Sequence, residues 1–143
     1  MSLNAAKMLT MSQSELDDLF SSCEAGPIPT GEAKGTPVFF PGSSFSDEIA
    51  QVINFFAWQG KVFDPEGGYL RNQILPFGIQ AIMAKVYKQE SWLDGKECIV
   101  LDYSETSMVA QLVRDEMRMV APDVYLGKVY WEKTRLIDFV LEF

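Results

Sequence analysis

The clearest pattern along the chain is the alternation of apolar and polar residues in its C-terminal half. In residues 135–143, every odd position from 137 onward is apolar and two of the even positions carry acids. This alternation is typical of a half-buried antiparallel strand. Similar patterns and turn signals, including an Asp-Gly pair at 94–95, predict four further strands at 82–88, 96–103, 116–120 and 124–132.

The N-terminal half predicts helices followed by a hairpin. Ser12 and Ser14 precede acids and an apolar face, which predicts a helix over residues 11–25. A second helix is expected from Ser44 or Ser46 to near Trp58. The remaining elements are a loop over 26–42 with an edge strand at 36–40, hairpin strands at 61–63 and 69–77, and a short helical connection at 106–113.

These elements predict a mainly β fold. Seven or eight short strands with two or three short helices, two of them N-terminal, favour a small antiparallel β-barrel, because closure leaves no unpaired strand edge. A roll or an open sheet with a helix across its mouth is the alternative. We expect a single domain over residues 1–143, with residues 1–10 disordered or partly vector-derived and Met8 or Met11 as the natural start.

Composition narrows the classes of function. The 143 residues are 48% hydrophobic and carry a formal charge of -8, which disfavours nucleic acid and membrane surfaces as partners. No signal peptide is apparent, so we expect a cytoplasmic protein. Histidine is absent, which excludes histidine-based catalysis and zinc-histidine sites, and we expect neither metal nor cofactor. Cys23 and Cys98 lie far apart without a CxxC and are expected to be reduced core thiols.

Several short motifs resemble a known group of proteins. They are Gly26-Pro-Ile-Pro, Trp58-x-Gly-Lys-x-Phe63, Asp115-Glu-Met-Arg118, Leu126-Gly127 and Phe139-x-Leu-Glu142. Over most of residues 15–143 the chain resembles uncharacterised bacterial calycin-like proteins related to the Gly-X-Trp-X-Gly family and its associated domain of unknown function. The eponymous motif itself is absent. The resemblance implies a lipocalin or fatty-acid-binding type of barrel that holds apolar ligands, or haem where a histidine is present.

The stretch FAWQGKVFD contains two candidate site residues, Trp58 and Lys61. One interpretation is structural: the indole plugs one end of a barrel, with the lysine stem lying over the ring. The other places both residues at the mouth of a cavity, where Lys61 attracts a ligand carboxylate and Trp58 supplies an apolar wall.

Five polar residues interrupt apolar strands: Asp102, Asp115, Glu116, Arg118 and Asp138. Asp102, Asp115 and Arg118, together with Tyr103, form the second candidate group. Alternation places either Asp102 or Tyr103 in the interior, but not both. A buried Asp102 would need a partner, and Arg118 is the expected one. The group either braces the fold or orients a ligand, and Met117 beside it fills either a core or a cavity wall.

Three hypotheses of function follow. The first is non-catalytic binding of a small apolar or amphipathic molecule in a cavity, with its polar group met by Arg118, Lys61 or Tyr103. The second is a cofactor-independent isomerase or cyclase with Asp102 as base and Tyr103 or Arg118 stabilising an oxyanion. The third is a solid barrel whose exposed aromatics mediate protein contacts, including a possible homodimer.

Overall fold

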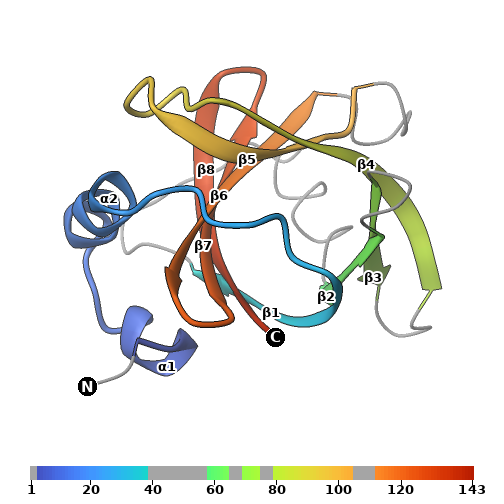
Figure 1. The fold of residues 1–143 in the computed structure, drawn as a ribbon, viewed down its shortest axis with the longest axis horizontal. Coiled ribbons are helices and arrows are strands. Elements are labelled where there is room, and N and C mark those ends of the chain that lie inside the picture. The colour runs from blue at the N-terminus through green and yellow to red at the C-terminus, as the bar shows by residue number, and fades with distance from the viewer. Residues whose placement is uncertain (1–2, 39–57, 65–68, 75–78, 105–111) are drawn as a thin grey trace.

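The computed structural model of the chain describes residues 3–38, 58–64, 69–74, 79–104 and 112–143. These residues form two short helices followed by strands (Figure 1). The elements are α1 (Ala5–Met8), α2 (Gln13–Ser22), β1 (Gly31–Val38), β2 (Trp58–Asp64), β3 (Tyr69–Ile74), β4 (Ile79–Glu90), β5 (Glu97–Asp102), β6 (Val113–Ala121), β7 (Val124–Trp131) and β8 (Thr134–Glu142).

The strands are hydrogen-bonded in chain order, each antiparallel to the next, and β8 pairs in turn with β1. The ladder of pairs therefore returns to its starting strand, and we call it the closed sheet. The predicted mainly β, antiparallel class is confirmed. The expectation that the first strand is an edge strand is wrong, because β1 pairs with β2 on one side and with β8 on the other.

Helix α2 begins where its sequence signals place it. The Ser12 side chain accepts a hydrogen bond from the Glu15 backbone, and the Glu15 carboxylate accepts one from the Ser12 backbone, which completes a capping box. The predicted helix over 11–25 is thus confirmed with narrower bounds. Residues 5–8, for which we expected disorder, form α1 instead, with Met8 fully buried.

Most of the predicted strands are present with shifted ends. The hairpin predicted after Trp58 corresponds to β2 and β3, and the C-terminal strands correspond to β4 through β8. Trp58 begins β2. The second predicted helix falls largely on residues 39–57, and the predicted helical connection at 106–113 falls largely on 105–111. Both ranges lie outside the described residues.

Buried apolar side chains gather in two layers, one on each face of the closed sheet. The interior cluster includes Ala33, Phe63, Ala84, Val86, Ile99, Leu101, Tyr103, Val113, Met117, Tyr125, Phe139 and Leu141. The outer cluster joins the helices to the outside of β5 through β8 and includes Ala5, Met8, Leu16, Phe20, Val38, Cys98, Val100, Leu126 and Val140. Because successive residues of a strand face opposite sides, both faces of β8 are buried.

The expectation of a solvent-exposed polar face on the last strand is therefore wrong. Asp138 is fully buried, since α2 lies over the outside of the sheet at this point (Figure 1). Among the described residues, no helix is long and apolar enough to cross a membrane.

One close contact in the interior ties two strands together. Gly127 of β7 pairs with Phe139 of β8, and the Phe139 ring lies directly over the glycine. A methyl group built on Gly127 would come within 2.0 Å of this ring. The absence of a side chain at position 127 thus provides the space that the buried ring occupies.

Gly127→Ala is expected to destabilise the protein by about 1–3 kcal/mol, because the buried Phe139 ring must shift away from the added methyl group. Urea denaturation of the purified variant measures the change. The double variant Gly127→Ala/Phe139→Leu should lose less stability than the sum of the two single variants, because leucine relieves the clash. Additive losses would contradict this account.

Candidate functional site

Strand alternation divides the predicted site residues between the two faces of the closed sheet. Tyr103, Asp115 and Met117 face the interior: Tyr103 and Met117 belong to the interior cluster, and Asp115 is bonded to Tyr103. Asp102 and Arg118 lie on the outside. As alternation predicts, Asp102 and Tyr103 are on opposite faces, and the structure does not bring the predicted residues together at one place.

Inside the closed sheet, a tyrosine and an aspartate form a buried polar pair. The Tyr103 hydroxyl donates to Asp115 Oδ2 over 3.3 Å, and the two residues are 0% and 3% exposed. Their strands are adjacent, and Met117 follows Asp115 on the same face of β6. The pair therefore places a hydroxyl and a carboxylate next to each other among the apolar side chains of the interior.

On the outer face, Asp102 accepts hydrogen bonds from the Tyr87 hydroxyl at 2.7 Å and from the Ser104 backbone at 2.9 Å. Burial acts to raise the pKa of Asp102, but the hydrogen bonds from Ser104 and Tyr87 outweigh it and hold the pKa below its ordinary value. Asp102 is therefore a stabilised carboxylate and a weak base.

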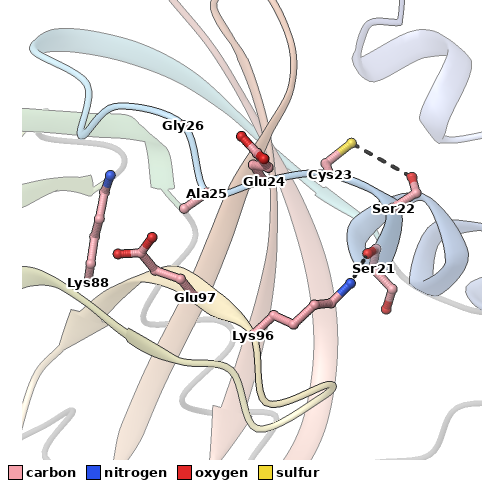
Figure 2. Close-up of a pocket in the computed structure, with 9 residues that line it drawn as sticks. All are labelled: Ser21, Ser22, Cys23, Glu24, Ala25, Gly26, Lys88, Lys96 and Glu97. Carbon is pink, nitrogen blue, oxygen red and sulfur yellow. Dashed lines mark hydrogen bonds between the residues drawn. The ribbon is translucent and has the colours of Figure 1, made fainter.

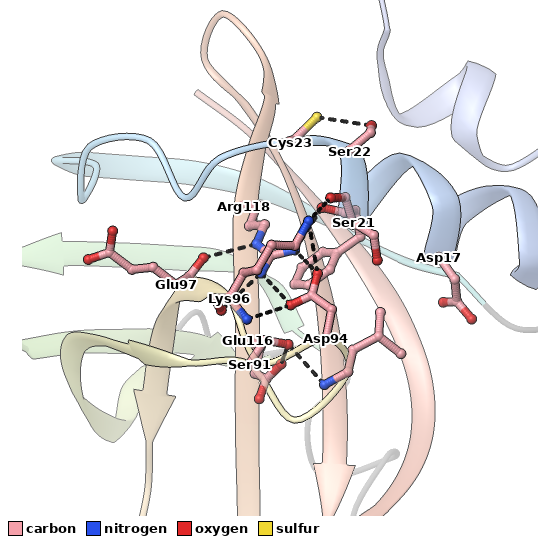
Figure 3. Close-up of polar contacts among 12 residues, drawn as sticks. Asp17, Ser21, Ser22, Cys23, Ser91, Asp94, Lys96, Glu97, Glu116 and Arg118 are labelled. Carbon is pink, nitrogen blue, oxygen red and sulfur yellow. Dashed lines mark hydrogen bonds and ion pairs between the residues drawn. The ribbon is translucent and has the colours of Figure 1, made fainter.

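Arg118 is a structural anchor of the outer face. It donates to both carboxylate oxygens of Asp94, at 2.6 and 2.7 Å, and to the backbone carbonyls of Phe20, Lys96 and Glu97 (Figure 3). The guanidinium also lies 4.3 Å from the centre of the Phe20 ring. The predicted pairing of Arg118 with Asp102 is wrong, because the hairpin turn between β4 and β5 brings Asp94 to the guanidinium.

A second ionic group, which the sequence analysis missed, lies beneath α2. Lys128 Nζ is 2.8 Å from Asp138 Oδ2 on the neighbouring strand and 2.7 Å from Asp17 Oδ1 on the helix. Arg135 holds Asp17 through two bonds of 2.7 and 2.9 Å. We call these four residues the ionic layer. Its sequence signals were Asp138, which interrupts an apolar strand, and the pair of acids on a helix whose opposite face is apolar.

The two candidates from the stretch FAWQGKVFD lie on β2. Lys61 occupies the register position opposite Ala33, a member of the interior cluster, and Trp58 pairs with Ile74 at the start of the strand. The side chains of both residues lie outside what the structure describes.

A pocket of about 650 Å³ lies between the end of α2 and the β4–β5 hairpin (Figure 2). None of the predicted site residues lines it. Its walls carry both signs of charge together with the half-exposed thiol of Cys23, and its lining residues are Ser21, Ser22, Cys23, Glu24, Ala25, Gly26, Lys88, Lys96 and Glu97.

The other cysteine, Cys98, is fully buried, and its burial raises the pKa of the thiol to about 12, so it is unreactive at neutral pH. Both cysteines are free thiols, but only Cys98 lies in the core as we predicted. Within the described ranges, no group of three or more acidic or cysteine side chains is arranged to hold a metal ion.

Comparison with known proteins identifies a shared fold. No family model matches the chain, and no curated protein matches it. Among solved structures, the chain is similar to the crystal structure of a protein from Thermomonospora curvata. The two share 18% sequence identity with a TM-score of 0.60, over 96% of this chain and 93% of the other. At this identity, the similarity extends to the fold alone.

Asp94→Asn is expected to lower the free energy of unfolding by about 2 kcal/mol at neutral pH, because Arg118 loses its charged partner. The hydrogen bonds from Arg118 hold the pKa of Asp94 below its ordinary 3.8. The stabilisation is therefore complete above that value and is lost as the pH falls below it.

Urea denaturation between acidic and neutral pH measures this difference. The gap between wild type and Asp94→Asn should narrow below about pH 4. Asp18→Asn, which alters an exposed aspartate of α2, serves as the matched control and should leave stability unchanged within a few tenths of a kcal/mol. An equal gap at every pH would refute the ion-pair explanation.

Proposed function

We propose that the closed sheet is a small calycin-like barrel that binds a small apolar or amphipathic molecule in its interior. The observation that carries this proposal is the Tyr103–Asp115 pair, buried among apolar side chains. Burying a carboxylate and a hydroxyl in apolar surroundings is costly. A ligand site is mostly apolar and uses a few polar groups of this kind to orient its ligand.

The interior also supplies the apolar part of such a site. Met117 and the partly buried Met119 lie on the same face of β6 as Asp115, and flexible thioethers adapt to irregular ligands. Trp131 and Ile28 pack against the same cluster. The ligand's apolar body would lie against these side chains, with its polar group at Tyr103 and Asp115.

The placement of Arg118 bears on the chemistry of that polar group. Its guanidinium is held on the outer face by Asp94, so we no longer expect it to meet a ligand in the interior. The hydroxyl of Tyr103 and the carboxylate of Asp115 suit a ligand that can donate a hydrogen bond, such as an alcohol or an amine. Lys61, opposite Ala33, remains our candidate for contact with the ligand near β2.

The enzyme hypothesis receives less support. It required Asp102 as base, with Tyr103 or Arg118 stabilising an oxyanion. Tyr103 lies on the opposite face of the sheet from Asp102, and the Arg118 guanidinium is bound by Asp94 instead. The interaction hypothesis rests on exposed apolar residues, of which Trp92 is 46% exposed. Trp92 already stacks edge-on against Tyr130 and lies under the Arg114 guanidinium at 4.3 Å. Ligand binding is therefore the function that we favour.

Tyr103→Phe is expected to weaken binding of decanol about five-fold, because the loss of one hydrogen bond is worth about 1 kcal/mol. The measurement is displacement of the dye anilinonaphthalene sulfonate from the folded protein, with decanol, decylamine and decanoate as competitors. Decanol and decylamine should displace the dye more effectively than decanoate, because only the first two can donate a hydrogen bond to the Asp115 carboxylate.

Tyr87→Phe is the matched control, since Tyr87 also bonds to an aspartate but on the outer face. This variant should bind all three competitors as the wild type does. The proposal fails if none of the competitors displaces the dye from the wild-type protein, or if Tyr87→Phe and Tyr103→Phe weaken binding equally.

A further inference from the structure

The ionic layer beneath α2 places an amine against a carboxyl group in a completely buried site. Lys128 and Asp138 occupy opposite register positions on β7 and β8, and both side chains are 0% exposed. The distance from Lys128 Nζ to Asp138 Oδ2 is 2.8 Å. The other oxygen, Asp138 Oδ1, has no hydrogen-bond partner among the described residues.

The surroundings act differently on the two members of this pair. The Phe20 ring of α2 has its centre 5.3 Å from Lys128 Nζ, a cation–π contact that favours the ammonium form. Burial raises the pKa of Asp138, which shifts the carboxyl group towards its neutral form, although Lys128 opposes this effect. A buried ion pair must recover the cost of removing both charges from water. A neutral amide between the same two residues would remove that cost altogether.

We propose that Lys128 and Asp138 condense into an intramolecular amide, a covalent bridge between β7 and β8. The reaction begins with transfer of a proton from the Lys128 ammonium to the Asp138 carboxylate, which leaves a neutral amine and a neutral acid. The nitrogen lone pair then forms a bond to Asp138 Cγ. The carbon–oxygen bond to the hydroxyl group breaks, and one water molecule leaves, so no oxidant or other co-reactant is needed.

Asp17 is the third group that the reaction requires. Its Oδ1 lies 2.7 Å from Lys128 Nζ, so it can take the proton that the nitrogen loses as the new bond forms and pass it to the departing hydroxyl. Arg135 fixes the Asp17 carboxylate by two hydrogen bonds and so keeps it at the amine. The helix that covers the pair thus supplies the proton carrier and excludes water at the same time.

The test is the intact mass of the purified full-length protein under denaturing conditions. The bridged protein weighs one water molecule less than its sequence requires, whereas the full sequence mass after prolonged incubation of the folded protein would overturn the proposal. Trypsin should also fail to cleave after Lys128 and should release a branched peptide that joins residues 119–133 to 136–143.

Control variants distinguish this bridge from other reactions that remove one water molecule from the protein. An imide at Asp94-Gly95 has the same mass change, but it would survive in Lys128→Arg, whereas the amide cannot form there. Asp17→Asn should abolish or greatly slow the loss of water, and Asp18→Asn on the same helix should not. A mass change that persists in Lys128→Arg, or that maps to 94–95, refutes the bridge and leaves the proposed ligand binding in the interior untouched.

Discussion

The pairing of β1 with β8 is the constraint on which the rest of the structure depends. Through it, the sheet has one enclosed face and one outward face. The enclosed face gathers the interior cluster and the Tyr103–Asp115 pair. The outward face of β5 through β8 is itself apolar and ionic, so it must be covered, and α1 and α2 cover it. Closure of the sheet thus explains why a mainly β chain begins with helices.

Helix α2 has one specific position on the outer face, because apolar burial and charge pairing act on it together. Phe20 lies against two cations, Arg118 and Lys128, and its own carbonyl accepts a hydrogen bond from Arg118. Asp17, one turn earlier, reaches the ionic layer. An apolar surface alone would tolerate several positions of a short helix, whereas these directional contacts fix one. The Asp94 turn, which is bound by the same arginine, is locked to the helix as well.

Local signals made much of this fold predictable, and long-range pairing explains what was missed. The C-terminal strands follow from alternation and tight turns, and α2 follows from Ser12 and its capping box. Asp138 has the pattern of a solvent-facing residue, and only the helix above it, with Asp17 more than a hundred residues away in sequence, makes it buried. The same limit applies to Arg118. Strand alternation predicts which face of the sheet it occupies. Its pairing with Asp94 instead of Asp102 depends on where the β4–β5 turn lies in space, and local sequence patterns do not predict that position.

Helix α2 and strand β1 lie far along the chain from several of their partners, and this separation has a consequence for folding. Helix α2 contacts β6, β7 and β8, and strand β1 pairs with β8 as well as with its sequence neighbour β2. The contacts of α2 and the β1–β8 pairing can therefore form only after β6 through β8 are in place, whereas the β1–β2 pairing can form earlier. Contacts between residues so distant in sequence make folding slow, because the two ends of the long chain segment between them must come together before the contacts can form. Until they form, the apolar outer face of β5 through β8 stays uncovered, and such exposed apolar surface favours aggregation during folding.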